Sequence, residues 1–160
     1  MLSLYHDPAG YGLGMKAGRF FYKNQIVYQI KNYKITNQPD YRTIQIDTDK
    51  HISNLDTLAY LNHSCNPNVI VDVMKMALIA LRDIAKGEII TYFYPSTEWN
   101  MARPFHCRCN SILCLGYISG AKTVPRNVLE QYFINPHIQQ MIQTYDQNAN
   151  LSEFVTRLKA

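Results

Sequence analysis

The stretch Asn62–Asn68, NHSCNPN, places a histidine, a cysteine and several asparagines between two apolar segments. LDTLAYL precedes this stretch and VIVDV follows it. Proline fixes the backbone angle φ, and serine and asparagine side chains bond to neighbouring backbone groups, so the composition is typical of a sharp turn. We therefore expect a polar turn that joins two core segments and carries reactive side chains.

The composition indicates one globular domain. The chain has 160 residues, of which 47% are hydrophobic and 18% charged, and these proportions are those of a folded protein. The formal net charge of +4 is ordinary for a soluble protein. Basic residues without any acid occur between Trp99 and Arg126, namely Arg103, Arg108, Lys122 and Arg126. This segment leaves open a patch for an anionic ligand or nucleic acid, although nucleic acid is not the expected partner.

The first residues, MLSLYHDPAG, show no targeting signal. The longest apolar run, Met76–Leu81, is too short to cross a bilayer. These features predict a protein of the cytoplasm, or of the nucleus in a eukaryote, that makes no membrane contact.

The cysteines suggest a metal site. Cys107, Cys109 and Cys114 form a C-x-C-x4-C cluster, and Cys65 lies upstream in NHSCNPN. Zinc in structural sites is held by four ligands, and clustered cysteines in a reducing compartment bind metal more often than they form disulfides. We expect these four cysteines to hold one structural zinc ion. Two alternatives stay open: Cys65 could be an ordinary buried cysteine, and His106 could compete as the fourth ligand.

The pattern of apolar residues predicts a β-rich body followed by helices. Expected strands share β-branched and aromatic residues; they are Ile26–Ile35, Tyr41–Asp47, Val69–Val73, Met76–Ile84 and Ile89–Tyr94. One or two helical turns are expected at Leu55–Asn62, with Asn54 as the N-cap. From about Pro125 onward, apolar residues recur at a spacing of three to four, which predicts helices packed on the sheets.

Several of these stretches together resemble the SET-domain protein-lysine methyltransferases. NHSCNPN resembles the family's N-H-S-C-x-P-N motif, and LRDIAKGEIITYFY resembles the second motif, R-x-I-x-x-G-E-E-L-T-[FY]-D-Y. GYG at Gly10–Gly12 resembles the N-terminal G-x-G turn, and C-x-C-x4-C resembles the post-SET zinc segment. YPSTEWN, PFHCRC and GYISGAK are similar to segments of small stand-alone members.

The resemblance implies a mostly β (α+β) fold, in which short sheets of the β-clip type form a pseudoknot. It implies that S-adenosylmethionine is bound by Gly12, Leu13, Gly14, Asn62, His63 and Tyr94. It also implies that Tyr94 is the catalytic tyrosine and that Tyr92 influences the number of methyl groups added. Without the resemblance, TYFY would be a plain aromatic strand and His63 an ordinary core histidine.

Three positions depart from the family pattern. Phe93 stands where the second motif usually has aspartate, and Ala59 stands where arginine usually precedes the first motif. Ile89 replaces the second glutamate of G-E-E. These changes leave open whether activity is impaired.

The expected organisation is a SET domain over residues 1–100, a post-SET zinc segment over 101–118 and a helical extension over 119–160. The expected function is S-adenosylmethionine-dependent methylation of a lysine side chain in a protein or peptide. The alternatives are methylation of a peptide or small-metabolite amine, and a SET-like scaffold without turnover. The amine substrate, the methylation state of the product and the oligomeric state do not follow from the sequence.

Overall fold

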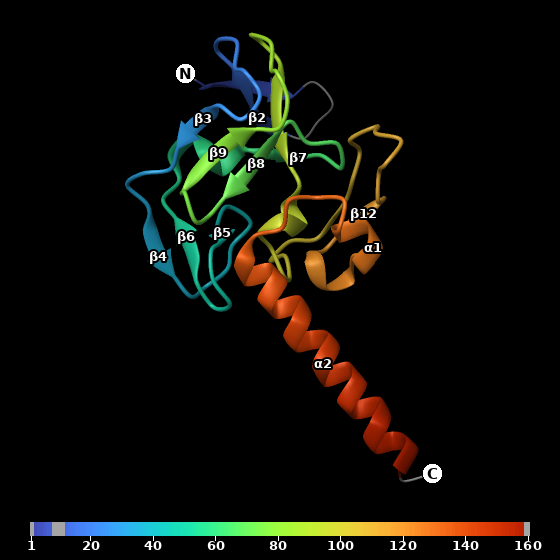
Figure 1. Cartoon of the computed structure of the whole chain (residues 1–160). Coiled ribbons are helices and arrows are strands. Elements are labelled where there is room, and N and C mark those ends of the chain that lie inside the picture. Colours follow the sequence, from blue (N-terminus) through green and yellow to red (C-terminus); the bar gives the residue numbers. More distant parts are fainter. Residues whose placement is uncertain (1, 8–11, 159–160) are drawn as a thin grey trace.

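The computed structural model describes residues 2–7 and 12–158, so Gly10 and Tyr11 of the glycine-rich stretch lie outside the described residues. The described part is built mainly of short strands (Figure 1). Their bounds are β1 Leu2–Asp7, β2 Gly12–Ala17, β3 Ile26–Gln29, β4 Lys34–Thr36, β5 Ile44–Gln45, β6 His51–Ser53, β7 Asn62–His63, β8 Val69–Asp72, β9 Ala77–Ala80, β10 Ile89–Tyr92, β11 Phe105–His106 and β12 Tyr117–Ile118. The mostly β prediction is confirmed.

The strands pair into four small sheets. Their orders are β1-β2-β10-β7, β3-β9-β8, β4-β6-β5 and β11-β12. In the first sheet, β7 and β10 are parallel, with Asn62 opposite Thr91 and His63 opposite Tyr92. This pairing places the turn motif directly beside the second motif, although they are far apart in the sequence.

Apolar side chains of the strands form the main core. Fully buried members include Met15 of β2, Ile52 of β6 and Leu78 of β9, so separate sheets contribute to one interior. Burial of such side chains is the main favourable contribution to folding. A second cluster joins Phe93 to residues of the C-terminal part, among them Leu129 and Ile138.

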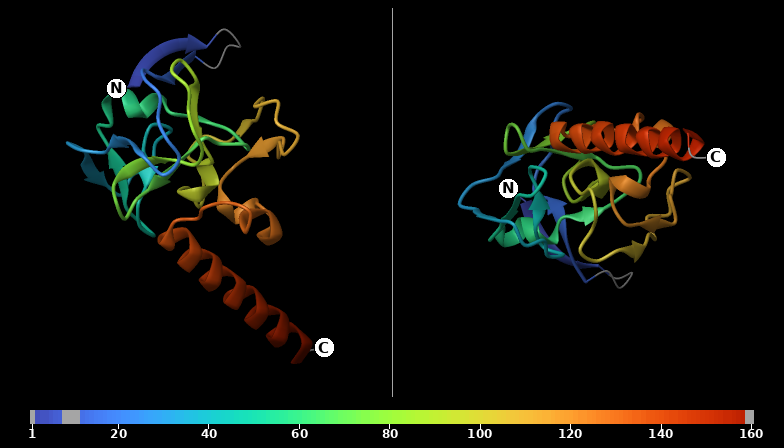
Figure 2. Two further views of the ribbon diagram at one scale, coloured as in Figure 1. Left: turned by 45° about the horizontal axis from the view of Figure 1, so that its top comes forward. Right: turned by 90° about the horizontal axis from the view of Figure 1, so that it is seen from below.

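The helical elements are short, except for the last one. Their bounds are the 3-10 turns η1 Asp56–Tyr60, η2 Tyr94–Ser96 and η3 Ala121–Thr123, and the helices α1 Arg126–Leu129 and α2 Pro136–Leu158. The start of α2 packs in the second cluster through Ile138. The rest of α2 extends away from the sheets (Figures 1 and 2). Within the described residues, no helix has the length and apolarity needed to cross a membrane.

Asn135, just before α2, ties the C-terminal part to the body. It is completely buried; its side-chain amide donates to the carbonyl oxygens of Val71 and Ser96 at 2.8 and 2.9 Å. Its side-chain oxygen accepts the Val73 N–H at 3.0 Å. Buried backbone groups need such partners, so Asn135 completes the hydrogen bonding of β8 and η2.

Several expected element boundaries are wrong. The strand expected at Ile26–Ile35 is split into β3 and β4 around Asn32, which has φ of 57° and so breaks the extended backbone. Asn54 is not an N-cap: it has φ of 60°, and its side chain donates to the Asn32 carbonyl oxygen. The expected strand at Ile89–Tyr94 ends at Tyr92, and Tyr94 begins η2.

Candidate functional site

A large cavity lies over the crossing of the two motifs. Its volume is about 920 Å³, and it is lined by Asn62 and His63 of β7, Tyr94 of η2 and aromatic residues such as Tyr5 and Phe105. A cavity of this size is typical of sites for small molecules and cofactors. Arginines line it as well, namely Arg82, Arg103 and Arg108, whereas none of its lining residues among those described is acidic. The cavity therefore suits a ligand with an apolar or aromatic body and an anionic group.

Gly14 brings the backbone of β2 close to this cavity. A Cβ atom on Gly14 would lie 2.8 Å from Asn62 Nδ2 and 2.6 Å from the Tyr5 ring, closer than real Cβ atoms approach their neighbours. Any larger residue would displace the Asn62 amide. Gly12, Leu13 and Gly14 all lie in β2 and are not among the described residues that line the cavity. Their predicted contacts to the cofactor stay predictions.

The chemistry of S-adenosylmethionine fits the residues of the large cavity. Arginines would pair with the carboxylate of the cofactor, Asn62 offers an amide oxygen to its ammonium group, and the aromatic rings would contact its adenine. When bound there, the cofactor would supply a methyl group on a sulfonium. The assignment of Asn62, His63 and Tyr94 to cofactor binding remains a prediction that this cavity supports.

The Tyr94 hydroxyl is fixed by one hydrogen bond, which it donates to the Leu61 carbonyl oxygen at 2.8 Å. Its ring lies against Tyr92, with ring centroids 4.8 Å apart. Burial, and next the charge of Glu98, raises the pKa of Tyr94 well above its ordinary value. Burial likewise raises the pKa of Tyr92. Both hydroxyls therefore stay protonated near neutral pH.

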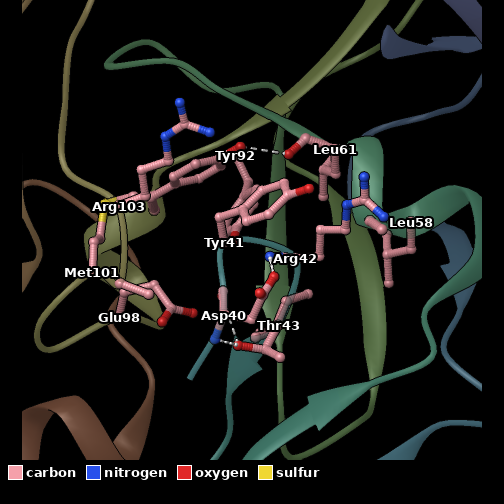
Figure 3. Close-up of a pocket in the computed structure, with 14 residues that line it drawn as sticks. Asp40, Tyr41, Arg42, Thr43, Leu58, Leu61, Tyr92, Glu98, Met101 and Arg103 are labelled. Atoms are coloured by element: carbon pink, nitrogen blue, oxygen red, sulfur yellow. Dashed lines mark hydrogen bonds between the residues drawn. The ribbon is translucent and has the colours of Figure 1, made fainter. Parts of the chain in front are cut away.

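A second, narrow cavity of about 40 Å³ adjoins this tyrosine pair. It is lined by residues 40–44 and by both tyrosines; Figure 3 shows Tyr41 and Tyr92 among the residues around it. The narrow and large cavities share Tyr41, Tyr94, Met101 and Arg103 as lining residues. Tyr94 thus lines both the large cavity and the narrow one.

The four cysteines come together as expected. The Sγ atoms of Cys65, Cys107, Cys109 and Cys114 all lie within 4.8 Å of one another, and all four thiols are free. A tetrahedral zinc ion with Zn–S bonds of about 2.3 Å places its sulfurs about 3.8 Å apart. Cys65 Sγ and Cys107 Sγ are 3.9 Å apart. The group therefore fits a closed zinc site, and His106 is not in it but packs on Tyr117.

His63 connects the cysteine cluster to the tyrosines. Its Nδ1 accepts the Tyr94 backbone N–H at 3.2 Å, so the proton must be on Nε2, which lies 3.3 Å from Cys65 Sγ. Burial lowers the pKa of His63 to about 4, so the ring is neutral. Its ring also packs edge-on against Tyr94 and Phe105. His63 thus lines the large cavity and also contacts a sulfur of the cysteine cluster.

Phe93, at the position where the family usually has aspartate, is a core residue here. It is 3% exposed, and its ring stacks on Tyr132 with a centroid distance of 3.8 Å and an interplanar angle of 9°. The Tyr132 hydroxyl donates to the Cys65 carbonyl oxygen at 2.7 Å. Where the family usually has aspartate, this chain therefore has an aromatic residue that packs against the C-terminal part. Ala59, at the other departure, packs against the main core.

Glu98 is a candidate residue that the sequence did not indicate. It lines the narrow cavity with Tyr92 and Tyr94 and is only 7% exposed. Burial raises its pKa to about 7, although hydrogen bonds from Gln45 and Thr97 act in the opposite direction. From the sequence, the segment YPSTEWN indicates only a resemblance to small family members. A single glutamate carries no periodic or spacing signal, so its burial could not be foreseen.

The fold is that of SET-domain proteins, and comparisons with known proteins show the family. The SET-domain family profile matches residues 12–95. The chain belongs to the SET-domain family. The predicted family, with its crossing motifs and cysteine cluster, is therefore confirmed.

Two curated relatives are methyltransferases by name. One is methyltransferase flvH of Aspergillus flavus, 38% identical over 104 residues, which cover 64% of this chain and 58% of that protein. Another is the histone-lysine N-methyltransferase, H3 lysine-36 specific, of Eremothecium gossypii, 28% identical over 160 residues, with 81% of this chain and 23% of that protein covered. The chain thus spans little more than half of the first relative and a quarter or less of the second.

A solved structure agrees in fold. KRYPTONITE in complex with mCHH DNA, H3(1-15) peptide and SAH superposes with a TM-score of 0.54 at 18% identity. The match covers 72% of this chain and 29% of that one. At this identity the likeness concerns the fold alone.

Proposed function

We propose that this protein is an S-adenosylmethionine-dependent N-methyltransferase that acts on the amine of a lysine side chain in a protein or peptide. The observation that carries the proposal is the meeting of a large and a narrow cavity at Tyr94. The large cavity would hold the methyl donor, and the narrow one would admit an alkylamine from the other side.

The reaction needs alignment more than it needs reactive side chains. Methyl transfer is an in-line displacement, so holding the amine and the sulfonium carbon in one line supplies much of the acceleration. The Tyr94 hydroxyl is fixed by the Leu61 carbonyl and the ring is packed against Tyr92. A rigid aromatic wall of this kind would keep the acceptor amine and the methyl donor aligned and would exclude water.

The names of related proteins support this choice of reaction and substrate. The H3 lysine-36 specific relatives act on a lysine by their printed name, and the KRYPTONITE complex contains a histone peptide and SAH. Methyltransferase flvH carries a name without a stated substrate. A small-molecule amine is the second candidate, because the narrow cavity of about 40 Å³ has room for little more than an alkylammonium group.

The zinc ion proposed for the cysteine cluster would stabilise the fold and take no part in methyl transfer. The cysteine group would hold one zinc ion with all four positions filled, and such closed sites stabilise a fold without binding substrate. The cluster joins the turn motif to the segment that carries Phe105, which lines the large cavity.

The test uses methyl-labelled S-adenosylmethionine with three acceptors: an H3(1–15) peptide, a cell lysate and a mixture of small alkylamines. Label in peptide or protein that disappears in Tyr94→Phe supports lysine methylation. Label only in the small-molecule fraction supports the second candidate. Cofactor binding without transfer to any acceptor contradicts both and favours a scaffold.

A further inference from the structure

The narrow cavity contains one buried carboxylate, that of Glu98. Figure 3 shows the Glu98 carboxylate directed into the cavity. Glu98 shares the cavity wall with Tyr92 and Tyr94, the residues beside which an acceptor amine would lie. At 7% exposure, its charge is poorly screened by water and would interact strongly with a cation placed beside it.

The two oxygens of Glu98 have different partners. Oε1 accepts the Gln45 N–H at 2.9 Å and the Thr97 hydroxyl at 3.2 Å. Oε2 lies 4.0 Å from His51 Nε2, which is beyond hydrogen-bonding distance. The carboxylate is therefore held in place through Oε1, whereas Oε2 has no hydrogen-bond donor among the described residues.

The nearby histidines do not supply a positive charge. His51 on β6 and His137 on α2 are buried, and burial lowers the pKa of each below its ordinary value. The Nδ1 atoms of both rings lack a hydrogen-bond partner within the described part of the chain. Both rings are consequently neutral near pH 7. His137 Nε2 is engaged with the Thr97 carbonyl oxygen at 2.9 Å.

The charged residues at the rim do not neutralise Glu98 either. Arg42 and Arg103 line the cavity, but Figure 3 shows their guanidinium groups at the far side from the Glu98 carboxylate. Both stack over the Tyr41 ring, at 5.0 and 5.9 Å from its centroid. Asp40 accepts the Arg42 backbone N–H. A buried carboxylate without a cation is costly, so the cavity favours a positively charged occupant.

We infer that Glu98 receives the ammonium group of the acceptor and takes its proton before methyl transfer. This inference rests on the proposed function and narrows the substrate class to amines that arrive as alkylammonium ions. One N–H bond of the ammonium breaks and an O–H bond forms on Glu98. The freed lone pair then forms the N–C bond as the S–C bond of the sulfonium breaks. Glu98 afterwards returns its proton to solvent.

The pKa of Glu98 suits a residue that takes a proton from the acceptor amine. Its pKa of about 7 lies near neutral pH, where a general base is most effective. A lysine amine has an ordinary pKa near 10.4, so at about pH 7.5 only about one molecule in a thousand is already neutral. A proton acceptor in the cavity would raise the share of reactive amine at the place where it is used.

The first test compares wild type with Glu98→Gln, which keeps the shape and removes the charge. With an H3(1–15) peptide or n-butylamine as acceptor, we expect kcat/KM to fall about 100-fold at pH 7. The loss in kcat/KM of Glu98→Gln relative to wild type should shrink to about tenfold or less at pH 9.5, because more of the amine is then neutral in solution. A purely structural role would give a deficit that does not change with pH. That result, or wild-type kcat/KM in Glu98→Gln, would overturn the inference.

A binding measurement keeps the inference testable if no acceptor is turned over. Carbon-13 NMR of the glutamate carboxyl groups follows the titration of n-butylammonium chloride, with 1-butanol as the neutral control. We expect a shifted Glu98 resonance with the cation and none with the alcohol. Because Glu98→Gln lacks this resonance, its binding is compared with that of wild type by calorimetric titration and should be at least tenfold weaker. Equal binding of cation and alcohol, or no binding of the cation, would contradict the inference, whatever the activity assays give.

Folding is checked separately in each variant. Zinc content and S-adenosylmethionine affinity report on the cysteine cluster and the large cavity, and Glu98 lines neither. Glu98→Asp retains the charge but withdraws it from the cavity. Its kcat/KM should lie between those of wild type and Glu98→Gln, and its loss should show the same pH dependence. If Glu98→Gln fails to fold, Glu98→Asp carries the kinetic test, and a loss independent of pH would overturn the inference.

Discussion

Asn68 and Thr91 are joined by two reciprocal hydrogen bonds. The Asn68 side-chain oxygen accepts the Thr91 N–H at 2.9 Å, and the Asn68 N–H donates to the Thr91 carbonyl oxygen at 3.2 Å. The Asn68 amide also donates to the Ile89 carbonyl oxygen at 2.7 Å. The last residue of the turn motif thus extends the parallel contact between β7 and β10, and one side chain secures the crossing of the two motifs.

The first prediction concerns this crossing. Asn68 is 2% exposed, and Asn68→Ala would leave the Thr91 N–H and the Ile89 carbonyl oxygen of β10 without their side-chain partner. We expect the free energy of unfolding to fall by about 3 kcal/mol, measured by chemical denaturation. Asn66→Ala, an exposed asparagine in the same turn, should change it by less than about 0.5 kcal/mol. Equal effects in both variants would contradict the role given to Asn68.

The second prediction concerns the tyrosine at the junction of the cavities. Tyr94→Phe removes the hydroxyl bonded to the Leu61 carbonyl and should lower kcat about 100-fold or more, since the acceptor and the donor lose their fixed alignment. Tyr22→Phe is the control, because Tyr22 is 69% exposed and lines neither cavity. Both variants are assayed with methyl-labelled cofactor. Unchanged transfer in Tyr94→Phe would remove Tyr94 from the reaction.

The third prediction concerns the metal. Fresh wild-type protein should contain about one zinc per chain, measured by inductively coupled plasma mass spectrometry. Cys65→Ser and Cys114→Ser should each reduce this content. Cys65→Ser should also weaken S-adenosylmethionine binding more than Cys114→Ser does, because Cys65 contacts the cavity-lining His63. Zinc well below one per chain in the wild type would refute the four-cysteine site.

The fourth prediction concerns the aromatic replacement in the second motif. Phe93→Asp restores the residue usual in the family but places a carboxylate against the Tyr132 ring. We expect a loss of at least about 3 kcal/mol in the free energy of unfolding, since the carboxylate would be buried without a cation. Phe93→Leu, which keeps an apolar side chain, should cost less. A stable Phe93→Asp variant would show that the stacking is dispensable.

The fifth prediction concerns pH. Glu98 has a pKa of about 7 in the folded protein against an ordinary value of 4.5, so the folded state holds its proton over a range where the unfolded state has lost it. The contribution of Glu98 to stability is therefore present below about pH 4.5 and decreases as the pH rises to about 7. The total change is on the order of 3 kcal/mol.

Comparison with Glu98→Gln isolates this contribution, because the neighbouring His51 and His137 are common to both proteins. The difference in free energy of unfolding, wild type minus variant, should decrease between about pH 4.5 and 7 and stay level above. A difference that stays constant over this interval would show that the pKa of Glu98 is not raised.

Local motifs predicted the centre of the fold well. The turn at Asn62–Asn68 and the C-x-C-x4-C cluster carry their information in adjacent residues, so the crossing and the gathering of the cysteines followed from their resemblance to known motifs. The broad β body was also foreseeable from its apolar pattern.

Features that depend on distant partners were not predictable. The stacking of Phe93 on Tyr132 and the burial of Glu98 against His51 join residues from separate parts of the sequence. The wrong N-cap at Asn54 has a similar cause, because its side chain bonds to the Asn32 carbonyl instead of the following helical turn. Tertiary contacts override local preference at such positions.

Asn135 also bears on the order in which the chain can fold. The backbone groups of Val71, Val73 and Ser96 belong to the body, yet the side chain that bonds to them is made much later in synthesis. As the chain leaves the ribosome from its N-terminus, strands and both motifs emerge with these buried positions still unpaired. The hydrogen bonding of the domain is therefore complete only after the segment just before α2 has been synthesised and has packed against the body.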